Sequence, residues 1–130
     1  MPHHAHGTFT VTMQPLDSPP AEGLSRFSID KQIHGDLEAT SKGEMLSGGD
    51  PHQGAAGYVA IERVTGTLDG RAGTFAIIHM GTMLAGSIPQ WNVLIAPGSG
   101  TGALTGITGT FTITIAAGKH SYVLNYALPQ

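Results

Sequence analysis

The sequence contains no cysteine and few charged residues. Without cysteine the chain can form no disulfide, no thiol nucleophile and no cysteine-based zinc site. Charged residues make up 12% of the 130 residues, which is about half the usual share. Only six residues are Lys or Arg, and they form no basic run. We therefore expect neither a nucleic-acid partner nor a membrane partner.

Long apolar runs are also missing. None approaches the ~18 residues of a membrane helix, and the N-terminal segment MPHHAHG lacks the apolar stretch of a signal peptide. We expect a cytoplasmic protein with a single β-barrel domain over residues 1–130. Residues 1–6 are expected to form a flexible tail in front of it.

Glycine and alternating segments are what the sequence has in quantity. The 19 glycines are roughly twice the average number and are spread along the chain, as many turns require. Apolar and polar residues alternate with a period of two, which is typical of strands. This pattern marks seven segments: 7–16, 24–33, 37–45, 58–68, 71–81, 91–96 and the hairpin 110–128. The segment TGALTGITG predicts only a helical turn.

These roughly eight strands follow one another in hairpins, which predicts an all-β fold. We expect a single eight-stranded antiparallel barrel, because closure removes exposed strand edges. Asp69-Gly70 is a strong type I′ turn signal, and Ala117-Gly118 marks the turn of the last hairpin. A three-residue loop centred on Gly35 would place Ile33 opposite Leu37.

The hairpin YVAIERVTGTLDGRAGTFAIIHMG combines apolar strands with a carboxylate and a histidine. With Asp69-Gly70 as the loop, opposed residues share a face. One face then carries Tyr58, Ala60, Glu62, Val64, Phe75, Ile77 and His79. The other carries Val59, Ile61, Arg63, Thr65, Thr74, Ala76, Ile78 and Met80. The apolar residues Val64, Phe75 and Ile77 make the first face the better interior.

Glu62 and His79 are diagonal neighbours on that interior face. A buried carboxylate must be paired or neutralised, and His79 and Lys31 are the available partners. Lys31 lies on the apolar face of its own strand. One interpretation is a catalytic acid–base pair of Glu62 and His79 in a small pocket. The other is a buried ion pair or hydrogen-bond network that closes one end of the barrel.

A pocket beside these residues would bind a small apolar or amphipathic ligand. Its predicted ligand-binding residues are Lys31, Tyr58, Phe75, Ile77, Trp91 and Tyr122. The one pair of histidines at i and i+2, His4 and His6, lies in the expected tail and not in an expected strand. A metal site from Glu62, His79 and His120 has no spacing to support it. No nucleotide-binding or hydrolase motif occurs either. We expect no metal and no cofactor.

Several long segments resemble one protein family. They are KQIHGDLEATSKGEML, GYVAIERVTGTLDGRAGTFAIIHMG, SGTGALTGITG and GKHSYVLNYAL. Together they resemble the DUF3224 family, a bacterial family of unknown function, over nearly the whole chain. That family is similar in fold to allene oxide cyclase and dirigent barrels, so the resemblance implies an eight-stranded antiparallel barrel. It implies no reaction, because function belongs to the site and not to the fold.

Three functions fit these observations. The first is a small-molecule-binding barrel with a partly polar lumen. The second is a cofactor-free isomerase or cyclase in which Glu62 and His79 transfer protons. The third is a structural, oligomeric barrel with a filled lumen. The outward face of the Tyr58–Gly81 hairpin is apolar, which predicts a homo-oligomer, with a dimer favoured.

Overall fold

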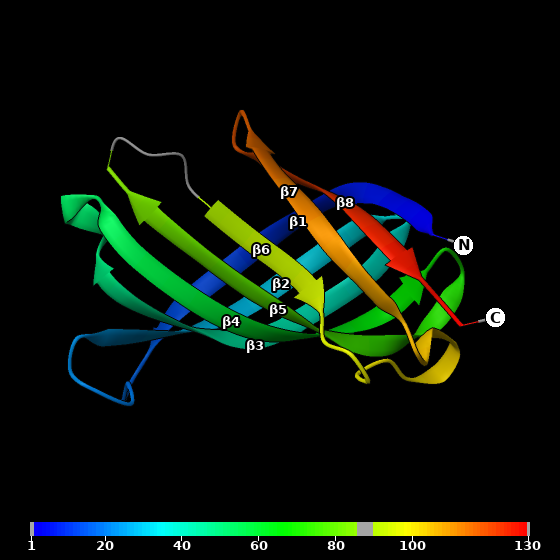
Figure 1. Cartoon of the computed structure of the whole chain (residues 1–130), viewed down its shortest axis with the longest axis horizontal. Coiled ribbons are helices and arrows are strands. Elements are labelled where there is room, and N and C mark those ends of the chain that lie inside the picture. The colour runs from blue at the N-terminus through cyan, green and yellow to red at the C-terminus, as the bar shows by residue number, and fades with distance from the viewer. Residues whose placement is uncertain (1, 86–89, 130) are drawn as a thin grey trace.

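The computed structural model describes residues 2–85 and 90–129, and its eight strands form one closed antiparallel barrel (Figure 1). The strands are β1 His3–Leu16, β2 Leu24–Gly35, β3 Leu37–Asp50, β4 Ala55–Leu68, β5 Arg71–Leu84, β6 Gln90–Ile95, β7 Thr108–Ala116 and β8 Lys119–Ala127. Two short 3-10 helices, η1 Pro51–Gln53 and η2 Gly102–Leu104, lie between strands. Each strand pairs with the next, and β8 pairs back with β1. The predicted fold class is confirmed.

The β4–β5 hairpin has the register predicted from its turn. Tyr58 pairs with Gly81, and Leu68 pairs with Arg71. Asp69 and Gly70 both have positive φ, at 48° and 83°, as a type I′ turn requires. The last hairpin turns at Ala117-Gly118 in the same way. Tight turns therefore set the faces of these two hairpins.

Two expectations about the chain are wrong. Ile33 pairs with Ala39 and not with Leu37, although a shift of two residues keeps both side chains inside the barrel. Residues 3–6 are not a tail, because they form the start of β1 and pair with β8. Ala5 is fully buried there. Residues 3–6 are needed to close the barrel, since part of β8 would otherwise present an unpaired edge.

The packed core fills one half of the barrel lumen. It includes Leu37, Leu68, Phe75 and Leu124, which are all almost fully buried. Helix η2 covers this end, where Leu104 is buried. Both chain termini lie at the same end in Figure 1. The β1–β2 loop and η1 lie at the opposite end, which we call the mouth.

The ladder between β6 and β7 is short. In the described residues it consists of Val93 with Phe111 and Leu94 with Thr110. Among the described residues, Trp91, further toward the mouth, pairs only with Gly81 on β5. A residue with a strand neighbour on one side alone is less covered, and Trp91 is 41% exposed.

Candidate ligand-binding pocket

A cavity of ≈ 280 Å³ occupies the half of the lumen next to the mouth. All eight strands contribute side chains to it, because the inward positions of each strand converge on the barrel axis. Its aliphatic wall consists of Val11, Ile29, Met45, Ala60, Ile113 and Ile115. Four of the polar residues in its lining form two separate pairs.

The first polar pair is Lys31 and Glu62. The Lys31 Nζ donates a hydrogen bond to Glu62 Oε2 at 2.9 Å, and the Ser41 hydroxyl donates to Glu62 Oε1 at 3.0 Å. Glu62 is 0% exposed and Lys31 8%. Lys31 Nζ also lies 5.1 Å from the centre of the Phe9 ring, where the face of the ring attracts a cation.

Small residues on β3 make this pairing possible. Lys31 on β2 and Glu62 on β4 are separated by the whole of β3. Ser41 lies directly opposite Lys31, and Gly43 lies directly opposite Glu62. Because neither residue has a bulky side chain, the long Lys31 side chain can cross β3 and reach the carboxylate.

The second polar pair is Tyr58 and His79. The Tyr58 hydroxyl and His79 Nε2 lie 2.7 Å apart, and the two rings meet edge to face. Burial lowers the pKa of His79, and the charge of Lys31 lowers it further, whereas Glu62 opposes the shift. Burial also raises the pKa of the Tyr58 hydroxyl, with a smaller contribution from Glu62. Both groups are therefore uncharged at neutral pH.

A glycine provides the space for the Tyr58 ring. Gly81 lies directly opposite Tyr58 across the β4–β5 ladder. A Cβ atom at position 81 would lie 2.6 Å from Cε1 of Tyr58, closer than real contacts allow. The sequence thus places a large ring against a residue with no side chain, which turns the tyrosine hydroxyl toward His79.

The structure brings five of the predicted site residues together at the cavity. Lys31, Tyr58, Glu62, His79 and Trp91 all line it, so the assignment of the interior face is confirmed. Their roles in binding or catalysis stay predictions. Glu62 and His79 are not hydrogen-bonded to each other in the structure, because each has a different partner.

The other three predicted ligand-binding residues lie deeper in the lumen. Phe75 is 1% exposed in the packed core. Ile77 and Tyr122 border a void of only ≈ 20 Å³, which has room for about one water molecule. The Tyr122 hydroxyl accepts a hydrogen bond from the Leu37 N–H at 3.1 Å. These three residues do not line the ≈ 280 Å³ cavity, because the closed half of the barrel is filled, and their role in ligand binding stays a prediction.

Sequence reasoning missed several lining residues. Phe9, Met13 and Met45 border the cavity, and Ser41 completes the Glu62 network. The signal for Ser41 was present in the alternation of β3, where a polar residue occupies an inward position. His120 also lines the cavity, with its ring 5.1 Å from that of Phe9.

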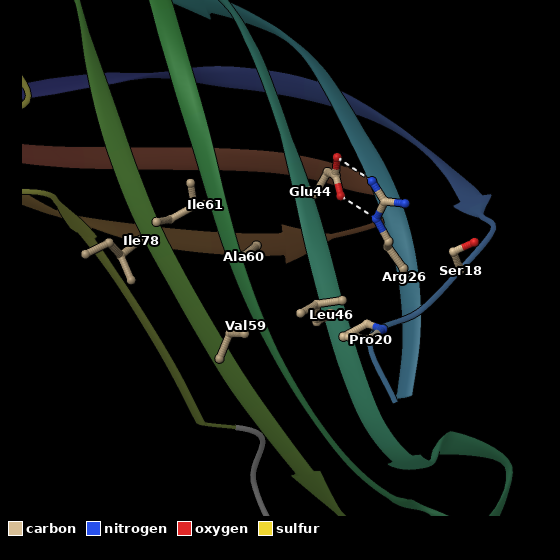
Figure 2. Close-up of a pocket in the computed structure, with 9 residues that line it drawn as sticks. All are labelled: Ser18, Pro20, Arg26, Glu44, Leu46, Val59, Ala60, Ile61 and Ile78. Atoms are coloured by element: carbon tan, nitrogen blue, oxygen red, sulfur yellow. Dashed lines mark hydrogen bonds and ion pairs between the residues drawn. The ribbon is translucent and has the colours of Figure 1, made fainter. Parts of the chain in front are cut away.

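A second hollow lies on the outside of the barrel, and Figure 2 shows its lining residues on neighbouring strands and on the β1–β2 loop. We call it the outer groove, and its volume is ≈ 490 Å³. Its lining includes Leu46, Val59, Ile61, Ile78, Arg26 and Glu44. The Arg26 guanidinium donates to both oxygens of Glu44, at 2.6 and 3.0 Å. Val59 and Ile61 are 56% and 61% exposed, so the outward apolar face is confirmed.

Metal clusters and membrane-spanning helices are both absent from the described residues. No group of three or more His, Asp or Glu side chains there lies close enough to hold a metal ion. No helix within residues 2–85 and 90–129 is long and apolar enough to cross a membrane.

Fold and site together define a closed eight-stranded barrel with a pocket in one half of its lumen. A family model described as "Protein of unknown function (DUF3224)" matches residues 5–126, and the chain belongs to this family. It is similar to a crystal structure of a DUF3224-family protein of unknown function from Shewanella oneidensis MR-1. The two are 39% identical with a TM-score of 0.88, over 100% of this chain and 99% of the other. No curated protein matches.

The resemblance to DUF3224 is thus confirmed. The further likeness to allene oxide cyclase and dirigent barrels stays a prediction. The family's description gives no activity, so any function must be argued from the pocket itself.

Proposed function

We propose that this protein binds a small, largely apolar molecule in the mouth half of its lumen. The observation that carries the proposal is the ≈ 280 Å³ cavity with an aliphatic wall and few polar groups. Sites for small molecules are usually concave and mostly apolar, with volumes of about 300–1,000 Å³ for drug-sized ligands. The volume here lies just below that range, which suits a ligand of one or two rings.

Differences in side-chain size along the lumen support this proposal. In the closed half, large residues such as Phe75 and Leu124 pack together. In the mouth half, the inward positions of β3, β4 and β5 include Gly43, Ala60 and Gly81. Of these three residues Ala60 lines the cavity, where its small side chain leaves space open, whereas the space at Gly81 holds the Tyr58 ring.

The environment of Glu62 favours binding over proton-transfer catalysis by this residue. Both of its carboxylate oxygens already accept hydrogen bonds, one from Lys31 and one from Ser41. A general base must reach the proton that it abstracts, and the Glu62 side chain is 0% exposed. The isomerase or cyclase alternative would thus have to use His79 with Tyr58.

A fluorescent apolar probe tests the proposal. N-phenyl-1-naphthylamine, whose emission rises in apolar surroundings, would be titrated into the protein at neutral pH. We expect saturable binding to one site, and loss of that binding in Ala60→Phe, because the added ring fills the cavity. Val59→Phe is the matched control, since the neighbouring side chain points outward.

Circular dichroism would check that both variants keep their β structure. Absence of saturable binding to the unmodified protein would contradict the proposal. So would a pattern in which Val59→Phe abolishes binding and Ala60→Phe does not, because the probe would then occupy the outer groove.

A further inference from the structure

The charges of the cavity are already balanced. Among the described residues that line the cavity, Lys31 and Glu62 are the two that belong to Asp, Glu, Lys or Arg, and two histidines line it as well. They are paired with each other at 2.9 Å, and Ser41 takes up the second oxygen of Glu62. No buried side-chain nitrogen or oxygen in the described residues lacks a hydrogen-bond partner.

This balance decides which ligand charges the cavity tolerates. A charged ligand must leave its hydration shell, and burial of an ion without a free counter-charge is costly. An anion beside Lys31 would also face the Glu62 carboxylate, and a cation beside Glu62 would also face the Lys31 ammonium, so the intact pair offers neither ion a net counter-charge. Breaking a buried pair leaves an uncompensated charge, so either ion would bind poorly.

Tyr58 and His79 provide a different kind of contact. Their hydrogen bond uses one site on the tyrosine hydroxyl. Within the described part of the chain, the Tyr58 hydroxyl makes this one hydrogen bond. A hydroxyl has one donor and two acceptor sites. If His79 Nε2 accepts the bond, the Tyr58 oxygen can accept from a ligand hydroxyl. If Nε2–H donates it, the Tyr58 hydrogen can go to a ligand carbonyl.

We infer that the pocket takes an uncharged, mostly apolar molecule with one hydroxyl or carbonyl group, which contacts the Tyr58–His79 pair. Aromatic side chains around the cavity, namely Phe9, Trp91 and Tyr58 itself, favour a flat ring system. The inference rests on the ligand binding proposed above and adds the charge and polarity of the ligand.

Four naphthalene compounds of similar size test it. They are naphthalene, 2-naphthol, 2-naphthoate and 2-naphthylmethylammonium, each used at neutral pH to displace N-phenyl-1-naphthylamine. Fluorescence is excited where the naphthalenes do not absorb. We expect 2-naphthol to bind at least about tenfold more tightly than either ion, because only the ions carry a buried, unpaired charge. An ion that binds as tightly as 2-naphthol would overturn the inference.

Tyr58→Phe tests the polar contact, because it removes the hydroxyl and keeps the ring. We expect 2-naphthol to fall to the affinity of naphthalene in this variant, while naphthalene itself is unaffected. Tyr126→Phe is the control. It removes another buried hydroxyl, which bonds Asp69 at the closed end, and should leave both affinities unchanged. If 2-naphthol keeps its advantage in Tyr58→Phe, the assigned contact is wrong.

The results separate this inference from the proposed function. If neither the fluorescent probe nor any naphthalene binds, ligand binding itself fails. If the probe and naphthalene bind but the ions compete equally well, only the inferred ligand class fails.

Discussion

Replacing Glu62 with alanine should destabilise the barrel strongly. The carboxylate is 0% exposed and accepts hydrogen bonds from Lys31 and Ser41. Glu62→Ala removes both acceptors at once and leaves the Lys31 ammonium, which is only 9% exposed, without its counter-charge. It also leaves space at a fully buried position.

The expected loss follows from these contacts. Breaking a buried ion pair by removing one partner costs about 3–5 kcal/mol. The stranded Ser41 hydroxyl accounts for about 1–3 kcal/mol, and this overlaps with the first figure because the two groups share one carboxylate. A loss of about 3–5 kcal/mol is a large part of the ~5–15 kcal/mol that stabilises a typical domain. It would lower Tm by roughly 10–20 °C.

Chemical and thermal denaturation would measure this loss. Glu62→Gln should cost less, because an amide oxygen can still accept a hydrogen bond from Ser41. The double variant Lys31→Met, Glu62→Met removes both charges and should recover most of the stability. Glu44→Ala is the surface control, since its pair with Arg26 is solvent-exposed and should matter far less. A change within error for Glu62→Ala would refute the buried pair.

Three further predictions concern other parts of the barrel. The pKa of His79 is lowered in the folded state, so the unfolded chain binds the proton more readily. The protein should therefore lose stability as pH falls below about 6.5, and His79→Gln should lose less, as denaturation midpoints at several pH values would show. Gly81→Val should displace the Tyr58 ring and lower both stability and probe affinity, whereas unchanged values would contradict the close contact. The exposed side chains of Val59 and Ile61 predict a homo-oligomer, most simply a dimer, which Ile61→Lys should weaken. Light scattering that gives the 13.4 kDa mass of one chain at micromolar concentration would exclude it.

The sequence predicts the fold and the faces of its strands well, for a physical reason. A two-residue type I′ turn at Asp69-Gly70 leaves one way to pair the flanking strands, so every inward residue of β4 and β5 follows by counting. Counting from the turn places Glu62 and His79 on one face, and the apolar residues Val64, Phe75 and Ile77 identify that face as the inward one. Successive side chains of a strand point to opposite faces, so every second residue along β4 and β5 lies on the inward, buried face.

The partner of Glu62 could not be predicted in the same way. Lys31 reaches it across β3, so their contact depends on the β2–β3 and β3–β4 registers together. The loop expected at Gly35 places Lys31 opposite Ala39, whereas the structure places it opposite Ser41. The β3–β4 register depends on the connection through η1, which carries no tight-turn signal. Two uncertain registers leave both His79 and Lys31 as candidates.

The position of the Lys31–Glu62 pair connects the stability of the barrel to its pocket. Lys31 borders both the ≈ 20 Å³ void of the closed half and the ≈ 280 Å³ cavity of the mouth half. On the closed side, aliphatic and aromatic packing holds the strands together. On the mouth side that packing is missing, and the pair with Ser41 connects β2, β3 and β4 instead. A charged network that is complete in itself can do this without filling the cavity, and it leaves no free charge facing a ligand. The same three side chains thus connect three strands around an open lumen and make it suitable for an uncharged molecule.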